Sequence, residues 1–199
     1  LLLVASLQAE QQASTVTRRV KAGDSNPYHI TQNTLRSLGL FQIVRKRFGA
    51  TAEDFAALLY GLGVYGRGKT ASQFDRVFNG QALFEVPLIL DDQPFSIIPE
   101  NEAERQKINH LCAALGMTYE VFRYVAKVVQ QTYGGESLRW SREVVSAFYR
   151  LVKLPRYLGL NTVEVLALLE LLDGGGSHLV SKLAGVTQIA THYASDNTD

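Results

Sequence analysis

The residue types that most invite chemistry occur in the string Gly63–Thr70. It reads Gly-Val-Tyr-Gly-Arg-Gly-Lys-Thr and fits the P-loop pattern G-x-x-x-x-G-K-[ST]. A P-loop binds phosphate because its backbone N–H groups converge at the start of a helix, directly after a β-strand. Here the preceding residues, 52–62, have the apolar spacing of an amphipathic helix, and no later strand ending in Asp follows to hold magnesium. We therefore interpret the string as a Gly-rich, basic connector between helices, with a P-loop nucleotide hydrolase as an alternative.

The connector interpretation predicts that the chain binds neither ATP nor GTP at millimolar concentration. Without a strand before it, the loop 63–70 should not direct its N–H groups at one phosphate. Isothermal titration calorimetry of the wild-type chain should therefore show no saturable binding, and Lys69→Ala should change nothing. Saturable binding that Lys69→Ala abolishes would contradict the connector and favour the hydrolase.

The other reactive side chains form no catalytic or metal-binding pattern. No histidine belongs to an H-x-x-x-H pair; the histidines are His29, His110, His178 and His192. We expect them at the surface or as helix caps. The single cysteine, Cys112, excludes an intramolecular disulfide and a cysteine-based zinc site, and we expect it to be a small buried apolar residue. No serine lies in a G-x-S-x-G elbow. We therefore expect no catalytic, cofactor-binding or metal-ligating residues.

The charge balance argues against nucleic-acid binding. The chain has 20 Lys+Arg and 19 Asp+Glu, a net charge of +1, without the basic bias of a nucleic-acid binder. Two basic clusters, 18–21 and 45–47, lie near the expected ends of helices, where cations are favourable. The residues after the second cluster, 52–57, are acidic and apolar rather than a basic recognition helix. No apolar run reaches the roughly 20 residues that a membrane-spanning helix needs, so we expect no membrane insertion by this segment alone.

Helical periodicity covers most of the sequence. The side chains of Phe55, Leu58, Leu59 and Leu62 fall at i, i+3, i+4 and i+7, which places them on one face of a helix. Similar stripes recur in 121–129, 144–152 and 165–172. With 46% hydrophobic residues the chain has the composition of a folded globular protein. The spacing predicts an all-α fold, an irregular array of about eight helices.

The expected helices meet at recurring corners. Three tripeptides share the order Gly, apolar residue, then Thr or Asn: Gly49-Ala50-Thr51, Gly116-Met117-Thr118 and Gly159-Leu160-Asn161. We expect each glycine to have positive φ and end one helix, and each apolar residue to fold back on that helix. We expect Thr51, Thr118 and Asn161 to cap the next helix by accepting a backbone N–H bond. Glu164 follows Asn161 by three residues, as in a capping box.

The chain is expected to form a single helical domain or a piece of a larger helical shell. We divide it into a leading helix (1–22), a first helical unit (28–80), an irregular insert (81–99), a second helical unit (100–185) and a tail (186–199). Within the insert, residues 83–98 contain two prolines and no helical stripe, and they fit a short hairpin of 86–90 with 95–98 or a packed irregular loop. From the residues at both ends we expect the sequence to be a piece of a longer polypeptide.

The stretch 70–79 carries the most specific motif. Phe74, Asp75, Arg76, Phe78 and Asn79, with Val77 where Leu is usual, resemble the F-D-R-L-F-N motif of the A subunits of bacterial toxin-complex (Tc) insecticidal toxins. In that family the motif follows a helix that ends in a Gly-rich loop, as 55–68 does here. Residues 148–150, 158–161 and 164–169 are similar to a later Leu-rich passage of the family. The resemblance extends over residues 29–183.

The resemblance implies a piece of the α-helical shell of such a toxin. The A subunit of that family is a bell-shaped homopentamer whose shell surrounds a translocation channel and opens at a pH trigger. A toxic enzyme held in a separate cocoon then passes through the channel. The shell is scaffold and gate, so the motif residues would be structural. The implied partners are the remainder of the chain's own A subunit and, in the parent, the other subunits of the pentamer, in a secreted or cell-surface toxin.

The spacing of the motif residues also predicts their contacts. Phe74 and Phe78, at i and i+4, should face the core, and Asp75 or Arg76 should pair or cap locally. A free-standing helical adaptor that binds a partner peptide or helix is the alternative to the shell segment.

Overall fold

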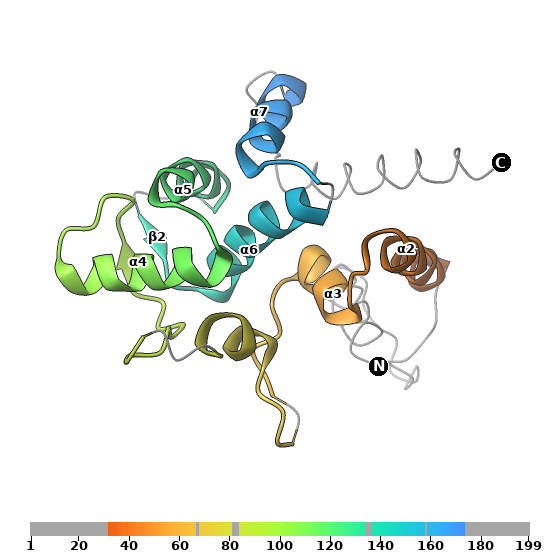
Figure 1. The fold of residues 1–199 in the computed structure, drawn as a ribbon, viewed down its shortest axis with the longest axis horizontal. Helices are drawn as coiled ribbons and strands as arrows, with labels where there is room; N and C mark the ends of the chain where they lie inside the picture. Colours follow the sequence, from red (N-terminus) through yellow and green to blue (C-terminus); the bar gives the residue numbers. More distant parts are fainter. Residues whose placement is uncertain (1–31, 67, 81–83, 134–136, 158, 174–199) are drawn as a thin grey trace, which may run out of the picture.

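The computed structural model describes residues 32–66, 68–80, 84–133, 137–157 and 159–173, and most of them are helical (Figure 1). The elements, in chain order, are α2 (Gln32–Phe48), α3 (Ala52–Tyr60), η1 (Asp75–Asn79), β1 (Pro94–Phe95), α4 (Glu102–Leu115), α5 (Tyr119–Tyr133), β2 (Leu138–Arg139), α6 (Arg142–Tyr157) and α7 (Thr162–Asp173). The predicted all-α class is confirmed, with seven helices in this part of the chain. The expected leading helix, 1–22, and the tail, 186–199, lie outside the described residues. No helix of the described ranges has the length and apolar character needed to cross a membrane.

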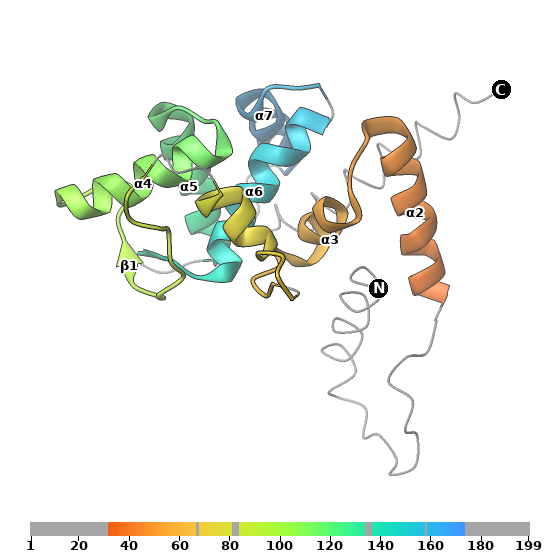
Figure 2. The ribbon, with the colours of Figure 1, turned by 60° about the horizontal axis from the view of Figure 1, so that its bottom comes forward.

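Helix α6 is the central element. It contacts α3, α4, α5 and α7, whereas α2 packs on α3. Both views of the ribbon place α4, α5 and α6 together, with α3 between α6 and the peripheral α2 (Figures 1 and 2). The short helix η1 packs against α4. The stretch 72–79 therefore follows the loop after α3 and packs on α4, one of the helices that surround α6.

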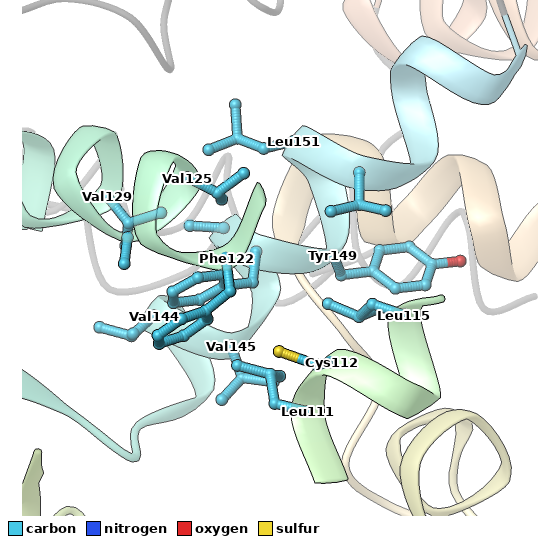
Figure 3. Packing of buried hydrophobic residues seen from close by; sticks show 14 of the residues in the cluster. Leu111, Cys112, Leu115, Phe122, Val125, Val129, Val144, Val145, Tyr149 and Leu151 are labelled. Carbon is cyan, nitrogen blue, oxygen red and sulfur yellow. The ribbon is translucent and has the colours of Figure 1, made fainter. Parts of the chain in front are cut away.

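Among the described residues, the buried apolar side chains form two separate clusters. The larger, which we call the main core, joins α4, α5 and α6 with the start of α7. Figure 3 shows the side chains that α4, α5 and α6 contribute to it. At its centre the rings of Phe122 and Phe148 stack with centroids 5.6 Å apart, and both side chains are fully buried. The smaller, the α2–α3 cluster, consists of Val44, Ala50, Phe55 and Ala56 with partly buried neighbours. Helix α3 contributes side chains to both clusters, because its Ala57 belongs to the main core.

The described part of the irregular insert, 84–99, is a packed loop that contains the short strand β1, and the alternative of a hairpin of 86–90 with 95–98 is wrong. Residues 84–93 have no regular structure, and Leu88 is buried among them. Pro94–Phe95 pairs instead with Leu138–Arg139, antiparallel, with Phe95 opposite Leu138. The physical reason is the aromatic contact beside this pair, where the rings of Phe95 and Trp140 stack with centroids 4.2 Å apart. Burial of both rings favours the distant partner over a local turn.

The three corner glycines all have left-handed backbone. Their φ angles are 67° at Gly49, 59° at Gly116 and 68° at Gly159. A bond from the Gly49 N–H to the carbonyl oxygen of Arg45, 2.9 Å long, ends α2. Paired bonds of the Schellman type end α4 and α6. The conformation is the one that the sequence predicted for these positions, because only glycine adopts it without a Cβ clash.

The residues after the corner glycines cap the next helix. The side chains of Thr51, Thr118 and Asn161 accept backbone N–H bonds of 3.1, 3.4 and 2.9 Å from residues inside α3, α5 and α7. Glu164 completes the capping box by accepting the N–H of Asn161 at 3.1 Å. The apolar residues between differ: Ala50 is buried, but Leu160 is 41% exposed, so it does not fold back into the core. The start of α7 offers it little cover, because Val163 is exposed as well.

Two glycine-to-alanine substitutions should have effects of opposite sign. At Gly159 the added Cβ meets no neighbouring atom, so only the positive φ opposes it, and Gly159→Ala should destabilise the chain by about 1 kcal/mol. Gly39 lies inside α2, also with nothing near its Cβ position. Gly39→Ala should therefore stabilise by about 0.5–1 kcal/mol. Urea unfolding followed by circular dichroism measures both, and equal shifts of the same sign would contradict the corner geometry.

Candidate functional site: a polar junction around residues 72–79

The first N–H group of the loop that resembles a P-loop, and the two N–H groups just before that loop, bond to the protein itself. The loop follows the helix α3, as the sequence predicted. The N–H of Gly61 donates to the carbonyl oxygen of Ala57 at 3.1 Å, that of Leu62 to Ser146 Oγ at 2.9 Å, and that of Gly63 to Gln73 Oε1 at 3.2 Å. These donors are not directed at a common point where a phosphate could lie. The helix before the loop and the bonded N–H of Gly63 support the connector.

The motif residues form the short π-helix η1 and the residue before it. Phe74 and Phe78 turn into the main core, with exposed fractions of 6% and 2%. Their rings lie 5.1 Å apart between centroids and are tilted by 35°. Side chains at i and i+4 lie next to one another on a helical turn, so this contact follows from the spacing of the two phenylalanines. The motif thus places two aromatic side chains against α4, on which η1 packs.

The charged residues of the motif stabilise the start of η1. The hydroxyl of Ser72 donates to Asp75 Oδ2 at 2.6 Å, and Ser72 Oγ accepts the N–H of Asp75 at 3.0 Å. The guanidinium of Arg76 donates to the carbonyl oxygen of Ala71 at 2.6 Å and forms an ion pair with Glu53 of α3. Both members of the ion pair are more than a third exposed, so it contributes at most about 1 kcal/mol. Local pairing and capping are thus the roles that these side chains adopt.

Asn79 ties η1 to the irregular loop. Its amide nitrogen donates to the carbonyl oxygen of Leu88 at 3.1 Å, and its Oδ1 accepts the N–H of Leu88 at 2.8 Å. The same nitrogen lies 3.1 Å from Asp75 Oδ1 and donates to it. A side-chain amide that bonds both backbone groups of one residue replaces a missing strand partner for that residue. Asn79 therefore fixes the loop that would otherwise have no regular hydrogen bonding.

His110 joins the end of η1 to α4. Its Nε2 lies 2.6 Å from the carbonyl oxygen of Phe78 and donates to it, and its ring stacks on Phe84 at 4.2 Å between centroids. The side chain is buried, so it does not lie at the surface; it caps a carbonyl near the end of η1. Within the described ranges no group of three His, Cys, Asp or Glu residues could hold a metal ion. Burial raises the pKa of the Cys112 thiol to about 12, which leaves that thiol protonated at neutral pH.

Three polar residues on one face of α6 complete the junction, and sequence reasoning did not find them. Arg142, Ser146 and Tyr149 are spaced i, i+4 and i+7. Arg142 Nε donates to the carbonyl oxygen of Leu62 at 2.8 Å, and Ser146 Oγ accepts the N–H of Leu62 at 2.9 Å. The hydroxyl of Tyr149 donates to Asp54 Oδ1 at 2.6 Å. We call this set the α3–α6 seam. Ser146 within an otherwise apolar stripe was the one signal for it in the sequence.

Asp54 is the electrostatic centre of this seam. Burial raises the pKa of its carboxyl, but hydrogen bonds from Tyr149, Thr51 and Tyr157 and the positive charge of Lys153 outweigh burial, so that pKa lies below its ordinary value. Burial, and then the bond to Asp54, raise the pKa of Tyr149, so its hydroxyl stays a donor. The ionised form of Asp54 is thus the one that the folded chain stabilises.

The stability that Asp54 contributes should depend on pH in a defined direction. Its folded-state pKa is depressed, so its contribution is fully present above the unfolded-state value of about 3.9 and is lost as pH falls through the folded-state pKa. Asp54→Asn should destabilise the chain at pH 7 and differ less from wild type near pH 3. Urea unfolding at both pH values measures this. Glu85→Gln, at an exposed loop position, is the control, and a constant Asp54→Asn deficit at both pH values would contradict the assignment.

The structure brings the motif residues together but keeps two of the corners apart from them. Asp75, Arg76 and Asn79 lie in one connected set with α3, α4 and the loop at Leu88. Of the corners, the one at Thr51 touches the α3–α6 seam through Asp54. The other two lie at the α4–α5 and α6–α7 connections. They are linked with one another instead, because Arg156 near the end of α6 donates to the carbonyl oxygens of Leu115 and Gly116.

Comparison with known proteins gives one kind of relative. No known protein family model matches the sequence. The chain is 34% identical over 163 residues to the toxin subunit YenA1 of Yersinia entomophaga, a match that covers 81% of this chain. The chain spans 14% of the length of that relative.

The fold has counterparts in two solved cryo-EM structures. One is TcdA4 of Morganella morganii, with a TM-score of 0.62 and 18% identity, covering 86% of this chain and 8% of that one. The other is TcaA-TcaB of Yersinia pseudotuberculosis, with a TM-score of 0.54 and 18% identity, covering 96% of this chain and 10% of that one. At this identity they show a shared fold. Together with the sequence match, the fold shows that this chain belongs to the A-type subunits of Tc toxins, of which it is a segment.

Proposed function

We propose that this segment is a non-catalytic part of the helical shell of a Tc-toxin A subunit. In this role it contributes to the assembled prepore that binds target cells and translocates a toxic enzyme. Its partners are the remainder of its own A-subunit chain and, in the parent, the other subunits of a pentamer. The parent is secreted or associated with the cell surface, and this segment does not itself insert into the membrane.

The observation that supports the proposal is how the side chains of the junction are used. Asp75, Arg76 and Asn79 each bond to neighbouring backbone or side-chain groups of the same chain. A catalytic set would instead present a nucleophile, base or oxyanion donor toward a substrate. The contacts of the junction hold α3, η1, α4 and the loop at Leu88 against one another.

The test compares assembly with activity in the full-length parent. Phe74 is buried in the main core, so Phe74→Ala should weaken this part of the shell and lower the yield of assembled toxin. The delivered enzyme, assayed separately, should keep its activity. Lys127→Ala, at an exposed position of α5, serves as the control and should assemble as wild type does. A Phe74→Ala parent that assembles normally, together with substrate turnover by the isolated wild-type segment, would refute the scaffold role.

A further inference from the structure

A cavity of about 300 Å³ opens beside the junction. Its walls come from α3, from the loop that follows α3, from the start of η1 and from the first residue of α6. The lining residues are Glu53, Ala56, Gly61, Gly63, Tyr65, Thr70, Ala71, Gln73, Arg76 and Arg142. The string that resembles a P-loop therefore borders a concave site, although the N–H of Gly63 is already bonded to Gln73.

Two side chains of this cavity, those of Arg142 and Gln73, carry N–H donors that bond to no other described residue and are open to solvent, and Arg142 is itself exposed. Arg142 uses its Nε for the carbonyl oxygen of Leu62, and within the described residues its two terminal nitrogens make no hydrogen bond or ion pair. Gln73 is nine-tenths buried, and its Oε1 accepts the N–H of Gly63. Its amide nitrogen donates to no group in the same part of the chain. Both side chains are held in place by a bond at one end and offer N–H groups at the other.

The rest of the wall leaves room for a ligand. A Cβ built on Gly61, where φ is 110°, would lie 3.0 Å from Ser146 Oγ and 3.8 Å from Arg142 Nη2. Glycine at this position therefore keeps a side chain away from the guanidinium. Tyr65 borders the cavity with 90% of its side chain exposed. Exposed tyrosine and arginine at a concave site are the residue types that contribute most often to protein binding.

The charge of the cavity selects the ligand. Both donors are free to exchange water for a ligand acceptor, and a guanidinium binds a carboxylate through two parallel bonds. Glu53 neutralises Arg76, which leaves the charge of Arg142 uncompensated among the charged lining residues. One uncompensated positive charge matches the single negative charge of a carboxylate better than the double charge of a phosphate dianion. Ala56 and Ala71 add small apolar surface for the methylene groups of an acidic side chain.

We propose that this cavity receives the carboxylate of an Asp or Glu side chain from another segment of the parent subunit. The carboxylate follows from the donors of Arg142 and Gln73. The source, a segment of the same subunit, rests on the proposed function. An anchored acidic side chain would join the α3–α6 seam to that neighbouring segment.

The experiment uses the complete 199-residue chain and a small probe. N-acetylglutamate N-methylamide is titrated into the ¹⁵N-labelled chain, and the resonances of the Arg142 Nε–H and the Gln73 amide are followed. We expect saturable shifts at both groups, and none with N-acetylglutamine N-methylamide, which has the same shape without the charge. Arg142→Gln should weaken binding at least about tenfold.

Two further variants separate loss of the site from loss of the fold. Tyr65→Ala changes an exposed side chain, so the chain should stay folded and bind the probe several-fold more weakly. Arg139→Gln changes an exposed arginine outside the cavity and should leave binding unchanged.

Three results would overturn the proposal: no saturable shift, equal shifts with the glutamine probe, or tighter binding of inorganic phosphate than of the carboxylate. The probe measures the isolated chain and the assembly test measures the parent, so either proposal can fail alone.

Discussion

Phe78→Ala is expected to destabilise the chain by about 3–5 kcal/mol, because removing a fully buried phenylalanine loses its transfer free energy and leaves a cavity. Phe78 is 2% exposed and belongs to the main core, where its ring contacts Phe74. A loss of this size is a large part of the roughly 5–15 kcal/mol by which domains are stable. Urea unfolding followed by circular dichroism gives the free energy of unfolding of both chains.

The matched control for Phe78→Ala is Val86→Ala. Val86 is 70% exposed in the loop after η1, so its truncation should change stability by less than about 0.5 kcal/mol. A Phe78→Ala chain that unfolds at the wild-type urea concentration would show that η1 does not anchor this region. The motif would then need a role other than packing.

Asn79→Ala is expected to have the second largest effect. Alanine would leave the N–H and the carbonyl oxygen of Leu88 without their partner, and Leu88 is 1% exposed. Each unsatisfied buried group costs about 1–3 kcal/mol, which gives about 2–6 kcal/mol for two groups. Both bonds are only partly buried, so we expect a total loss in the lower part of that range, about 2–4 kcal/mol. Amide hydrogen exchange should show the same change locally, as faster exchange at Leu88.

Asn109→Ala provides the comparison for this second change. Asn109 is exposed within α4, where alanine is the better helix former, so the substitution should be neutral or slightly stabilising. If the Asn79→Ala chain is as stable as wild type and the exchange rate at Leu88 is unchanged, water replaces the bonds of the asparagine without a loss of free energy. The loop would then not depend on η1 for its position.

Local patterns predicted the helices well because burial has a fixed period along a helix. The spacing of Phe55, Leu58 and Leu59 encodes one face of α3, and the corner glycines encode the ends of α2, α4 and α6. Both signals act over a few residues, so neighbouring side chains suffice to specify them. The expected burial of Phe74 and Phe78 rested on the same short-range spacing.

Contacts between distant residues were not predictable in this way. The pairing of Phe95 with Leu138 and the bonds between Asn79 and Leu88 depend on where the folded helices bring the chain. The π-helical form of η1 has no periodic signal in five residues. Ser146 and Tyr149 read as ordinary members of a helix until α3 meets them, so the α3–α6 seam required the structure.

Two separate apolar clusters give the chain two cooperative units of unequal strength. The α2–α3 cluster is small, and among the described helices α2 packs chiefly on α3. Detachment of α2 would uncover Val44 and part of Phe55 while the rings of Phe122 and Phe148 stay stacked. Such sub-global openings need less free energy than complete unfolding. The segment should therefore yield first at α2 when it is strained, with α4, α5 and α6 remaining as a folded remnant from which α2 can dock again.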